Sequence, residues 1–122
     1  MISIVDDDKS MRDATDCLVR SLGYRTATFD SAEEFIGSGR LNDTSCLITD
    51  VQMPGLSGLE LQDHLIADGR ALPVIFMTAH AEEAVRVRAL RAGAVGFFRK
   101  PFDGHELADC LDRAVAANSR QF

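Results

Sequence analysis

The sequence predicts an α/β fold built on one parallel sheet with helices on both of its faces. Short apolar runs alternate five times with longer stretches in which apolar residues recur at helical spacing. The runs are continuously apolar and do not alternate with polar residues, which favours strands buried on both faces. No linker, repeat or low-complexity tract divides the 122 residues, so we expect one domain over residues 1–122.

The first repeat begins with the apolar run Ile2–Val5, which we interpret as a buried strand. The helix that follows has apolar residues at helical spacing, namely Met11, Ala14, Leu18 and Leu22. Gly23 then ends this helix, because glycine readily adopts the conformations that terminate one. These four side chains mark the predicted apolar side of the helix.

The second and third repeats follow the same pattern. Residues 24–29 are extended in character, and Asp30 and Ser31 supply a cap for a short helix. Residues 46–49 form the third apolar run, which ends at Asp50. The next helix has a predicted apolar stripe of Leu59, Leu61, Leu65 and Ile66.

The last two repeats complete the predicted sheet. Residues 74–77 are a fourth strand dense in apolar residues, and residues 82–92 are predicted to form a helix that Gly93 closes. Residues 95–98 form the fifth strand. The final helix is amphipathic, with an apolar face of Leu107, Cys110, Leu111 and Ala114.

Composition narrows the range of partners. The net charge of −6 argues against direct nucleic acid binding by this domain, because such binding needs positive charge to neutralise phosphates. No run approaches the roughly 18 apolar residues of a membrane span, and no secretory leader is recognisable, so we expect a cytoplasmic protein without membrane contact. Cys17, Cys46 and Cys110 include no CxxC pair, and we interpret them as buried thiols.

Polar residues follow four of the predicted strands at the points where those strands end. They are Asp6, Asp7 and Asp8 after the first strand, Asp50 after the third, Thr78 after the fourth and Lys100 after the fifth. Ligands of open parallel sheets bind outside the carboxyl ends of the strands. We therefore expect these acids, the hydroxyl and the amine to converge on one site.

The acids at this edge favour a magnesium site. Carboxylates packed closely together repel one another, and a hard divalent cation relieves that repulsion. Mg²⁺ prefers oxygen ligands, which Asp6, Asp7 and Asp50 can provide together with a backbone carbonyl from the loop after Asp50. A carboxylate is also a nucleophile toward phosphorus, so Asp50 can accept a phosphoryl group whose oxygens Lys100 and Thr78 contact.

These residues also have plainer interpretations. Asp6, Asp7 and Asp8 can cap the first helix, and we assign that role to Asp8 alone. Thr78 can end its strand by bonding to its own loop, and Lys100 can be a solvated surface lysine. The functional interpretation is favoured because all of these residues occur together in one chain.

Four segments resemble the response-regulator receiver domains of two-component signalling. They are IVDDD at residues 4–8, ITDVQMPG at 48–55, MTA at 77–79 and RKPF at 99–102. Their order and spacing match that family over essentially the whole chain, and residues 50–60 and 93–102 resemble its FixJ-like subgroup. The resemblance implies a flavodoxin-like, doubly wound (βα)5 fold with strand order 2-1-3-4-5 and helices on both faces.

The resemblance also implies roles for the acidic residues. Asp50 would be the phospho-acceptor, and Mg²⁺ would be bound by Asp6, Asp7, Asp50 and the backbone carbonyl of Gln52. Gln52 and His80 occupy two positions that tune the lifetime of the phosphate in this family. From the residues alone, His80 either lines the site or lies in solvent.

The resemblance assigns three more positions. Thr78 and Lys100 would sense the phosphoryl group, and Phe97 matches an aromatic switch position. A phenylalanine in a strand is also commonly a core residue, so both interpretations of Phe97 stay open. The Lys100–Pro101 peptide bond would be cis.

The implied function is phosphorelay signal transduction. A sensor histidine kinase or a phosphotransfer protein would supply the phosphoryl group, and the surface of the fourth helix, fifth strand and fifth helix would then be switched. A phosphorylation-dependent homodimer is one expected output. The chain would be a phospho-acceptor switch and not an enzyme, with slow self-dephosphorylation at most.

Three other functions compete with this interpretation. A phosphatase of the haloacid dehalogenase type needs a second aspartate two residues after the nucleophile, where this chain has Gln52. A flavin-binding electron carrier needs a phosphate loop after the first strand, where this chain has Asp-Asp-Asp-Lys. The third alternative is a receiver used only as a docking module and never phosphorylated.

Overall fold

The structure is a computed structural model that describes residues 1–100 and 102–119. The strands are β1 Ile2–Val5, β2 Thr26–Phe29, β3 Cys46–Asp50, β4 Val74–Thr78 and β5 Gly96–Arg99. The helices are α1 Lys9–Ser21, α2 Ala32–Gly37, α3 Gly58–Ala67, α4 Glu83–Arg91 and α5 Gly104–Ser119, with a short 3-10 turn, η1, at Leu41–Asp43. The predicted cis bond at Pro101 lies outside the described residues.

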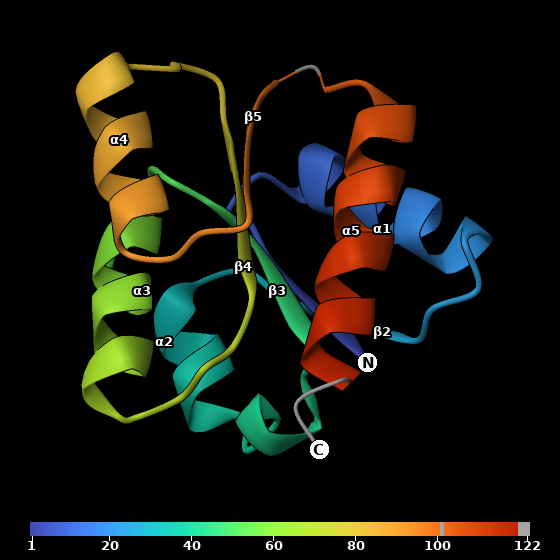
Figure 1. Cartoon of the computed structure of the whole chain (residues 1–122), viewed down its shortest axis with the longest axis horizontal. Coiled ribbons are helices and arrows are strands. Elements are labelled where there is room, and N and C mark those ends of the chain that lie inside the picture. The colour runs from blue at the N-terminus through green and yellow to red at the C-terminus, as the bar shows by residue number, and fades with distance from the viewer. Residues whose placement is uncertain (101, 120–122) are drawn as a thin grey trace.

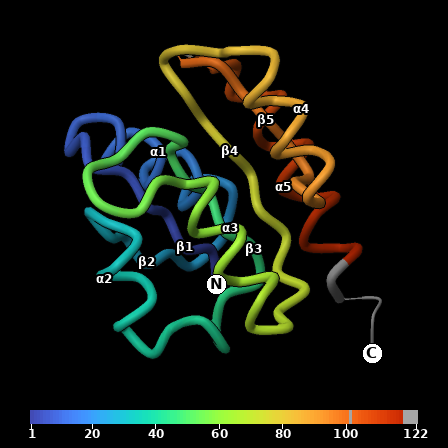
Figure 2. The backbone as a smooth tube through the Cα atoms, turned by 90° about the vertical axis from the view of Figure 1, so that its left-hand side faces the viewer, coloured from blue at the N-terminus to red at the C-terminus, as the bar shows by residue number. Residues whose placement is uncertain are grey.

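All paired strands are parallel, and their order is β2-β1-β3-β4-β5. Helices α1 and α5 cover one face of the sheet, and α2, α3 and α4 cover the other (Figure 1). The predicted fold class, strand order and two-sided helical cover are therefore confirmed. Seen from the side, β2 with α1 and α2 lies at one end of the sheet, and β5 with α4 and α5 lies at the other (Figure 2).

Two hydrophobic cores lie on opposite faces of the sheet because successive strand residues point to opposite sides. Along β4, Phe76 faces the core under α2, α3 and α4, whereas Ile75 and Met77 face the core under α1 and α5. The final helix buries all four of its predicted apolar residues, Leu107, Cys110, Leu111 and Ala114. The continuous apolar runs are thus explained by burial on both faces.

The buried side of α1 differs from the predicted one. Thr15 and Val19 are its fully buried residues, whereas Ala14 is exposed and Leu22 is 38% exposed. The helix is rotated by about one residue relative to the apolar pattern. Thr15 is absent from that pattern, but its β-branched side chain is buried, and its hydroxyl has no hydrogen-bond partner among the described residues.

Two further expectations, the burial of Cys17 and of Ile66, are corrected by their exposure. Cys17 is exposed, because it lies about 200° around α1 from the buried Thr15, whereas Cys46 and Cys110 are buried as predicted. Ile66 is 51% exposed, because it is one residue past the buried Leu65 and turns away from the sheet. Each of the two exposed side chains lies on a helix face that does not pack against the sheet.

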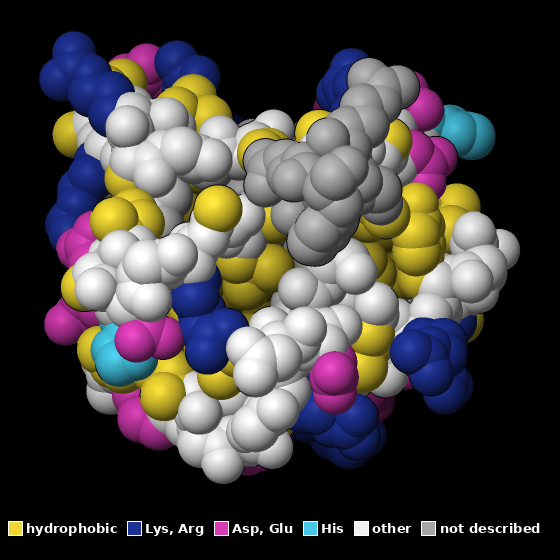
Figure 3. Space-filling view, turned by 60° about the horizontal axis from the view of Figure 1, so that its bottom comes forward, with side chains coloured by type: hydrophobic (Ala, Val, Ile, Leu, Met, Phe, Trp, Pro, Cys, Tyr) yellow, Lys and Arg dark blue, Asp and Glu magenta, His cyan; other side chains and the backbone are white. Residues whose placement is uncertain are grey.

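The fifth strand begins one residue later than predicted, at Gly96. Val95 donates its backbone N–H to the Val74 carbonyl at 2.9 Å, but its side chain is 45% exposed at the sheet's amino-terminal edge. Val95 and Ile66 line an apolar groove of about 320 Å³ there, and Figure 3 looks onto this edge. None of the described helices is long and apolar enough to cross a bilayer.

Candidate functional site

The polar residues predicted to converge lie at the carboxyl edge of the sheet, where the chain leaves β1, β3, β4 and β5. The order β2-β1-β3 makes this edge a switch point, since the connections from β1 and β3 leave in opposite directions. A pocket of about 460 Å³ opens there. It is lined by Asp8, Met11, Asp50, Gln52, Thr78, Ala79, His80 and Lys100.

Three carboxylates gather beside this pocket. One oxygen from each of Asp6, Asp7 and Asp50 lies within 4.8 Å of the other two. Asp6 and Asp50 are buried, whereas Asp7 is exposed. Hard oxygen donors at this spacing suit a small divalent cation such as Mg²⁺, so the residues present fit the predicted ion.

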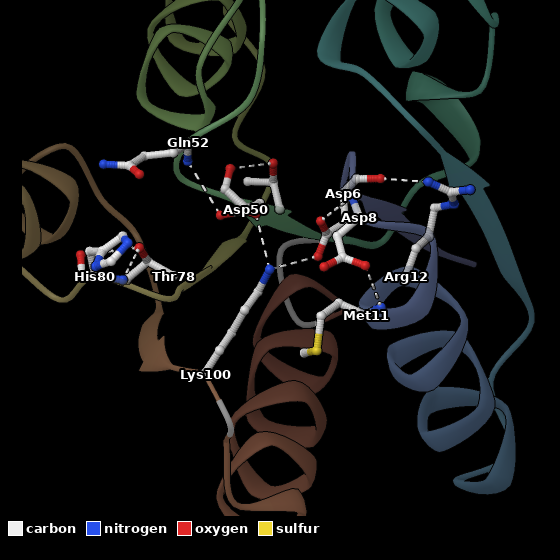
Figure 4. Close-up of polar contacts among 10 residues, drawn as sticks. Asp6, Asp8, Met11, Arg12, Asp50, Gln52, Thr78, His80 and Lys100 are labelled. Atoms are coloured by element: carbon white, nitrogen blue, oxygen red, sulfur yellow. Dashed lines mark hydrogen bonds and ion pairs between the residues drawn. The ribbon is translucent and has the colours of Figure 1, made fainter.

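Lys100 holds two of these acids together. Its Nζ donates to Asp6 Oδ2 at 2.9 Å and to Asp50 Oδ2 at 3.0 Å, and Figure 4 shows the ammonium between the two carboxylates. Burial alone would lower the pKa of Lys100, but its hydrogen bonds to Asp6 and Asp50 outweigh burial and raise it. The amine is therefore charged at neutral pH, and the alternative of a solvated surface lysine is wrong.

Burial disfavours the ionised form of the Asp50 carboxyl. Burial raises the pKa of its carboxyl above the ordinary value, and the hydrogen bond from Lys100 offsets only part of that effect. Its Oδ1 also accepts the Gln52 backbone N–H at 3.3 Å. The hydrogen bonds from Gln52 and Lys100 thus orient the Asp50 carboxylate, but the charge of Lys100 does not fully offset the cost of its burial.

Gly58 allows α3 to begin directly against the end of β3. A Cβ at this position would lie 2.2 Å from the Asp50 carbonyl oxygen and 3.1 Å from a ring carbon of Phe76. The Gly58 N–H donates to the Val51 carbonyl at 2.8 Å, which closes the loop after Asp50. Gly58 is not among the predicted site residues, because its close approach to Asp50 depends on tertiary packing.

The loop after β1 is fixed by polar contacts on both sides. Asp6 Oδ1 accepts the Asp8 N–H at 2.9 Å, and Asp8 caps α1 by accepting the Met11 N–H at 3.2 Å, as predicted. Arg12 Nη1 donates to the Asp6 backbone carbonyl at 2.8 Å (Figure 4). Arg12 was not among the predicted site residues, because it lies within a helix with no motif around it.

Thr78 and His80 form the far wall of the pocket. The Thr78 hydroxyl donates to the His80 carbonyl and accepts the His80 N–H, both at 3.1 Å. Thr78 therefore makes the loop contacts of its plainer interpretation, and its role toward a phosphoryl group stays a prediction. His80 is exposed and lines the pocket, as one of its two interpretations held.

The two remaining predicted site residues are Gln52 and Phe97. The Gln52 side chain is exposed and extends away from Asp50 in Figure 4, and the metal contact of its carbonyl stays a prediction. Phe97 does not line the pocket. Its ring is partly buried in the core under α3 and α4, with its centroid 6.3 Å from that of Phe76, and its switching role also stays a prediction.

Comparisons with known proteins agree on one family. The family model described as response regulator receiver domain matches residues 2–112. Nodulation protein W of Bradyrhizobium diazoefficiens is 43% identical over 120 residues, which cover 98% of this chain and 52% of that protein. The chain therefore spans about half the length of this curated relative.

Solved structures of response regulators also resemble this chain. The response regulator StyR matches with a TM-score of 0.89 at 39% identity, over 98% of this chain and 61% of that one. The structure titled FixJ-N matches with a TM-score of 0.83 at 32% identity, over 94% of this chain and 92% of that one. The predicted likeness to the FixJ-like subgroup is confirmed.

Proposed function

The chain belongs to the response regulator receiver family, and we propose that it accepts a phosphoryl group on Asp50 in a reaction that requires Mg²⁺. The observation that carries this proposal is the contact of Lys100 with both Asp6 and Asp50, beside the third carboxylate of Asp7. Pairing of this kind holds the nucleophile in place and keeps a cation next to the atom where new negative charge arrives.

Each residue has a defined part in the proposed reaction. An Asp50 carboxylate oxygen attacks phosphorus, and the bond from phosphorus to the donor group breaks. Asp6, Asp7, Asp50 and the Gln52 carbonyl would hold Mg²⁺, whose charge would neutralise the phosphoryl oxygens. Lys100 keeps its bond to Asp6 and transfers its other donor from Asp50 to a phosphoryl oxygen.

The switch would then spread from the site to one side of the molecule. The Thr78 hydroxyl exchanges its contacts with the His80 backbone for a phosphoryl oxygen. Phe97 turns toward the space that Thr78 leaves, and the surface formed by α4, β5 and α5 repacks. This is a shift between two packings of the same chain, driven by contacts that exist only after phosphorylation.

The proposed partners follow from this chemistry. A sensor histidine kinase or a phosphotransfer protein supplies the phosphoryl group in the cytoplasm, and a second copy of the chain binds the repacked surface. Residues 1–122 act as one receiver domain that makes no direct contact with nucleic acid, in keeping with the net charge of −6. The protein turns over no external substrate, and loss of the phosphate is slow self-hydrolysis.

Mass spectrometry tests the proposal directly. The purified chain is incubated with acetyl phosphate, with Mg²⁺ or with EDTA, beside Asp50→Asn and an Asp43→Asn control on the surface turn η1. We expect one phosphoryl group on the wild type and on Asp43→Asn with Mg²⁺ only, and none on Asp50→Asn. An unmodified wild type in every arm would favour the docking module, and continuous release of phosphate from a generic ester would favour the phosphatase.

A further inference from the structure

The hydrogen bond from Arg12 to Asp6 supports the strand end that carries the metal-binding acids. Backbone pairing between β1 and β2 ends with Val5 opposite Phe29, and the Asp6 N–H still reaches the Phe29 carbonyl at 3.1 Å. The Asp6 carbonyl lies one step further on, where it accepts from Arg12 Nη1 at 2.8 Å. A side chain of α1 thus holds the chain where the regular pairing stops.

The two neighbouring acids are held very differently. The Asp6 carboxylate is buried and accepts from both Lys100 and the Asp8 N–H. Asp7 is exposed, so its direction depends largely on the backbone around it. Because a peptide unit is planar, holding the Asp6 carbonyl also orients the Asp6–Asp7 peptide and the bond from which the Asp7 side chain departs.

We propose that Arg12 is a positioning residue that presents Asp7 to the cation by holding the Asp6–Asp7 peptide. This inference rests on the proposed Mg²⁺-dependent function and adds a residue to it. Groups behind metal ligands commonly set how tightly the metal binds, because they fix the orientation of the ligands. Arg12 would do so through the main chain, without contacting the ion.

Charge and geometry predict opposite effects of removing Arg12. The guanidinium of Arg12 adds positive charge on the Asp6 main chain, and positive charge beside a metal site disfavours a bound cation, so a purely electrostatic role predicts tighter Mg²⁺ binding after Arg12→Met. A positioning role predicts weaker binding, because the Asp6–Asp7 peptide loses its support. The sign of the change therefore separates the two roles.

The test is a Mg²⁺ titration of the whole chain, followed by NMR or calorimetry, with thermal unfolding in EDTA as a measure of folding. Arg12→Met is expected to weaken Mg²⁺ binding about 10-fold, and Arg12→Lys, which keeps the positive charge but loses the planar guanidinium, a few-fold. Arg20→Met is the matched control on the same helix, because Arg20 is exposed and only approaches Asp16 at 3.9 Å. It should bind Mg²⁺ like the wild type.

Equal or tighter binding by folded Arg12→Met would overturn the inference while leaving the proposed function intact. A wild type that binds no Mg²⁺ would instead overturn the proposed function. If Arg12→Met does not fold, Arg12→Lys decides: weaker binding supports positioning, and unchanged binding contradicts it. A lower unfolding temperature in EDTA with an unchanged Mg²⁺ dissociation constant would show a structural role only.

Discussion

Strands β1, β3 and β4 are buried along their whole length, whereas every residue of β5 keeps part of its surface exposed. Helix α4, which packs beside β5, buries only Ala89 of its nine residues, whereas α3 buries five of ten. The acids of the site project from the well-packed centre, and Lys100 reaches them from the end of β5. The acids thus come from strands that are fully buried, whereas the lysine comes from an edge strand whose residues are only partly buried or exposed.

The largest expected contrast is between two phenylalanines that contact each other. Phe76 is fully buried in β4, and Phe97 is partly exposed in β5. Phe76→Ala should lower the free energy of unfolding by about 3–5 kcal/mol, and Phe97→Ala by roughly half of that or less. Urea unfolding measures both, and equal losses would mean that the edge is packed as tightly as the centre.

A smaller effect is expected where α3 meets β3. Gly58→Ala places a methyl group 2.2 Å from the Asp50 carbonyl oxygen, so we expect a loss of about 1–3 kcal/mol together with slower phosphorylation. Gly37→Ala is the matched control, because no described atom outside its own chain neighbours and helix backbone lies within 4 Å of the position that its methyl group would take, and it should be neutral or slightly stabilising. Similar behaviour of the two variants in urea would show that the junction at Asp50 adapts freely.

A still smaller effect should be confined to α4. The buried Gln62 side chain donates to the Ala89 carbonyl at 3.1 Å and so connects α3 to α4. Gln62→Leu should weaken this connection by about 1 kcal/mol, because the carbonyl still accepts from the Ala94 N–H. Amide exchange should accelerate in α4 and stay unchanged in β3.

The exposed ion pair between the same two helices provides the control for Gln62. Arg88 and Asp63 lie 2.9 Å apart with both side chains more than half exposed, so Asp63→Ala should change exchange in α4 very little. If Asp63→Ala accelerates amide exchange in α4 as much as Gln62→Leu does, the buried hydrogen bond of Gln62 is not what stabilises the position of α4. If exchange accelerates in β3 as well, α4 does not move independently of the centre.

The last prediction concerns charge at the centre. Burial raises the folded-state pKa of Asp50, so the unfolded chain loses this proton first as the pH rises above 3.8, and folding becomes less favourable through that window. Asp50→Asn in EDTA should therefore raise the unfolding temperature at pH 7, and the gain should shrink toward pH 4. Asp13→Asn should have the opposite sign, because Lys9 lowers the pKa of Asp13.

Most of the fold was predictable because its signals are local. Continuous apolar runs identify strands that are buried on both faces, and Gly23 and Gly93 lie where the preceding helices end. The errors concern which side of a helix packs. Thr15 is buried and Cys17 exposed in α1, because neighbouring strands and α5 decide the rotation of the helix, and those contacts are distant in sequence.

The candidate site likewise contains residues that local sequence predicts and residues that it does not. Asp6, Asp7, Asp50 and Lys100 could be brought together from the order of strand ends, because parallel strands finish at one edge. Gly58 and Arg12 could not, since one acts through a close approach and the other through a main-chain carbonyl. Neither role can be inferred from the residues that lie nearby in the sequence.

Helix α5 has a consequence for anyone who attaches a reporter to this protein. It begins at Gly104, a few residues after Lys100, and its 16 residues make a rod of about 24 Å that runs to the opposite edge of the sheet. A fluorophore attached at the carboxyl-terminal end of α5 would therefore lie at the edge of the sheet opposite the acidic pocket.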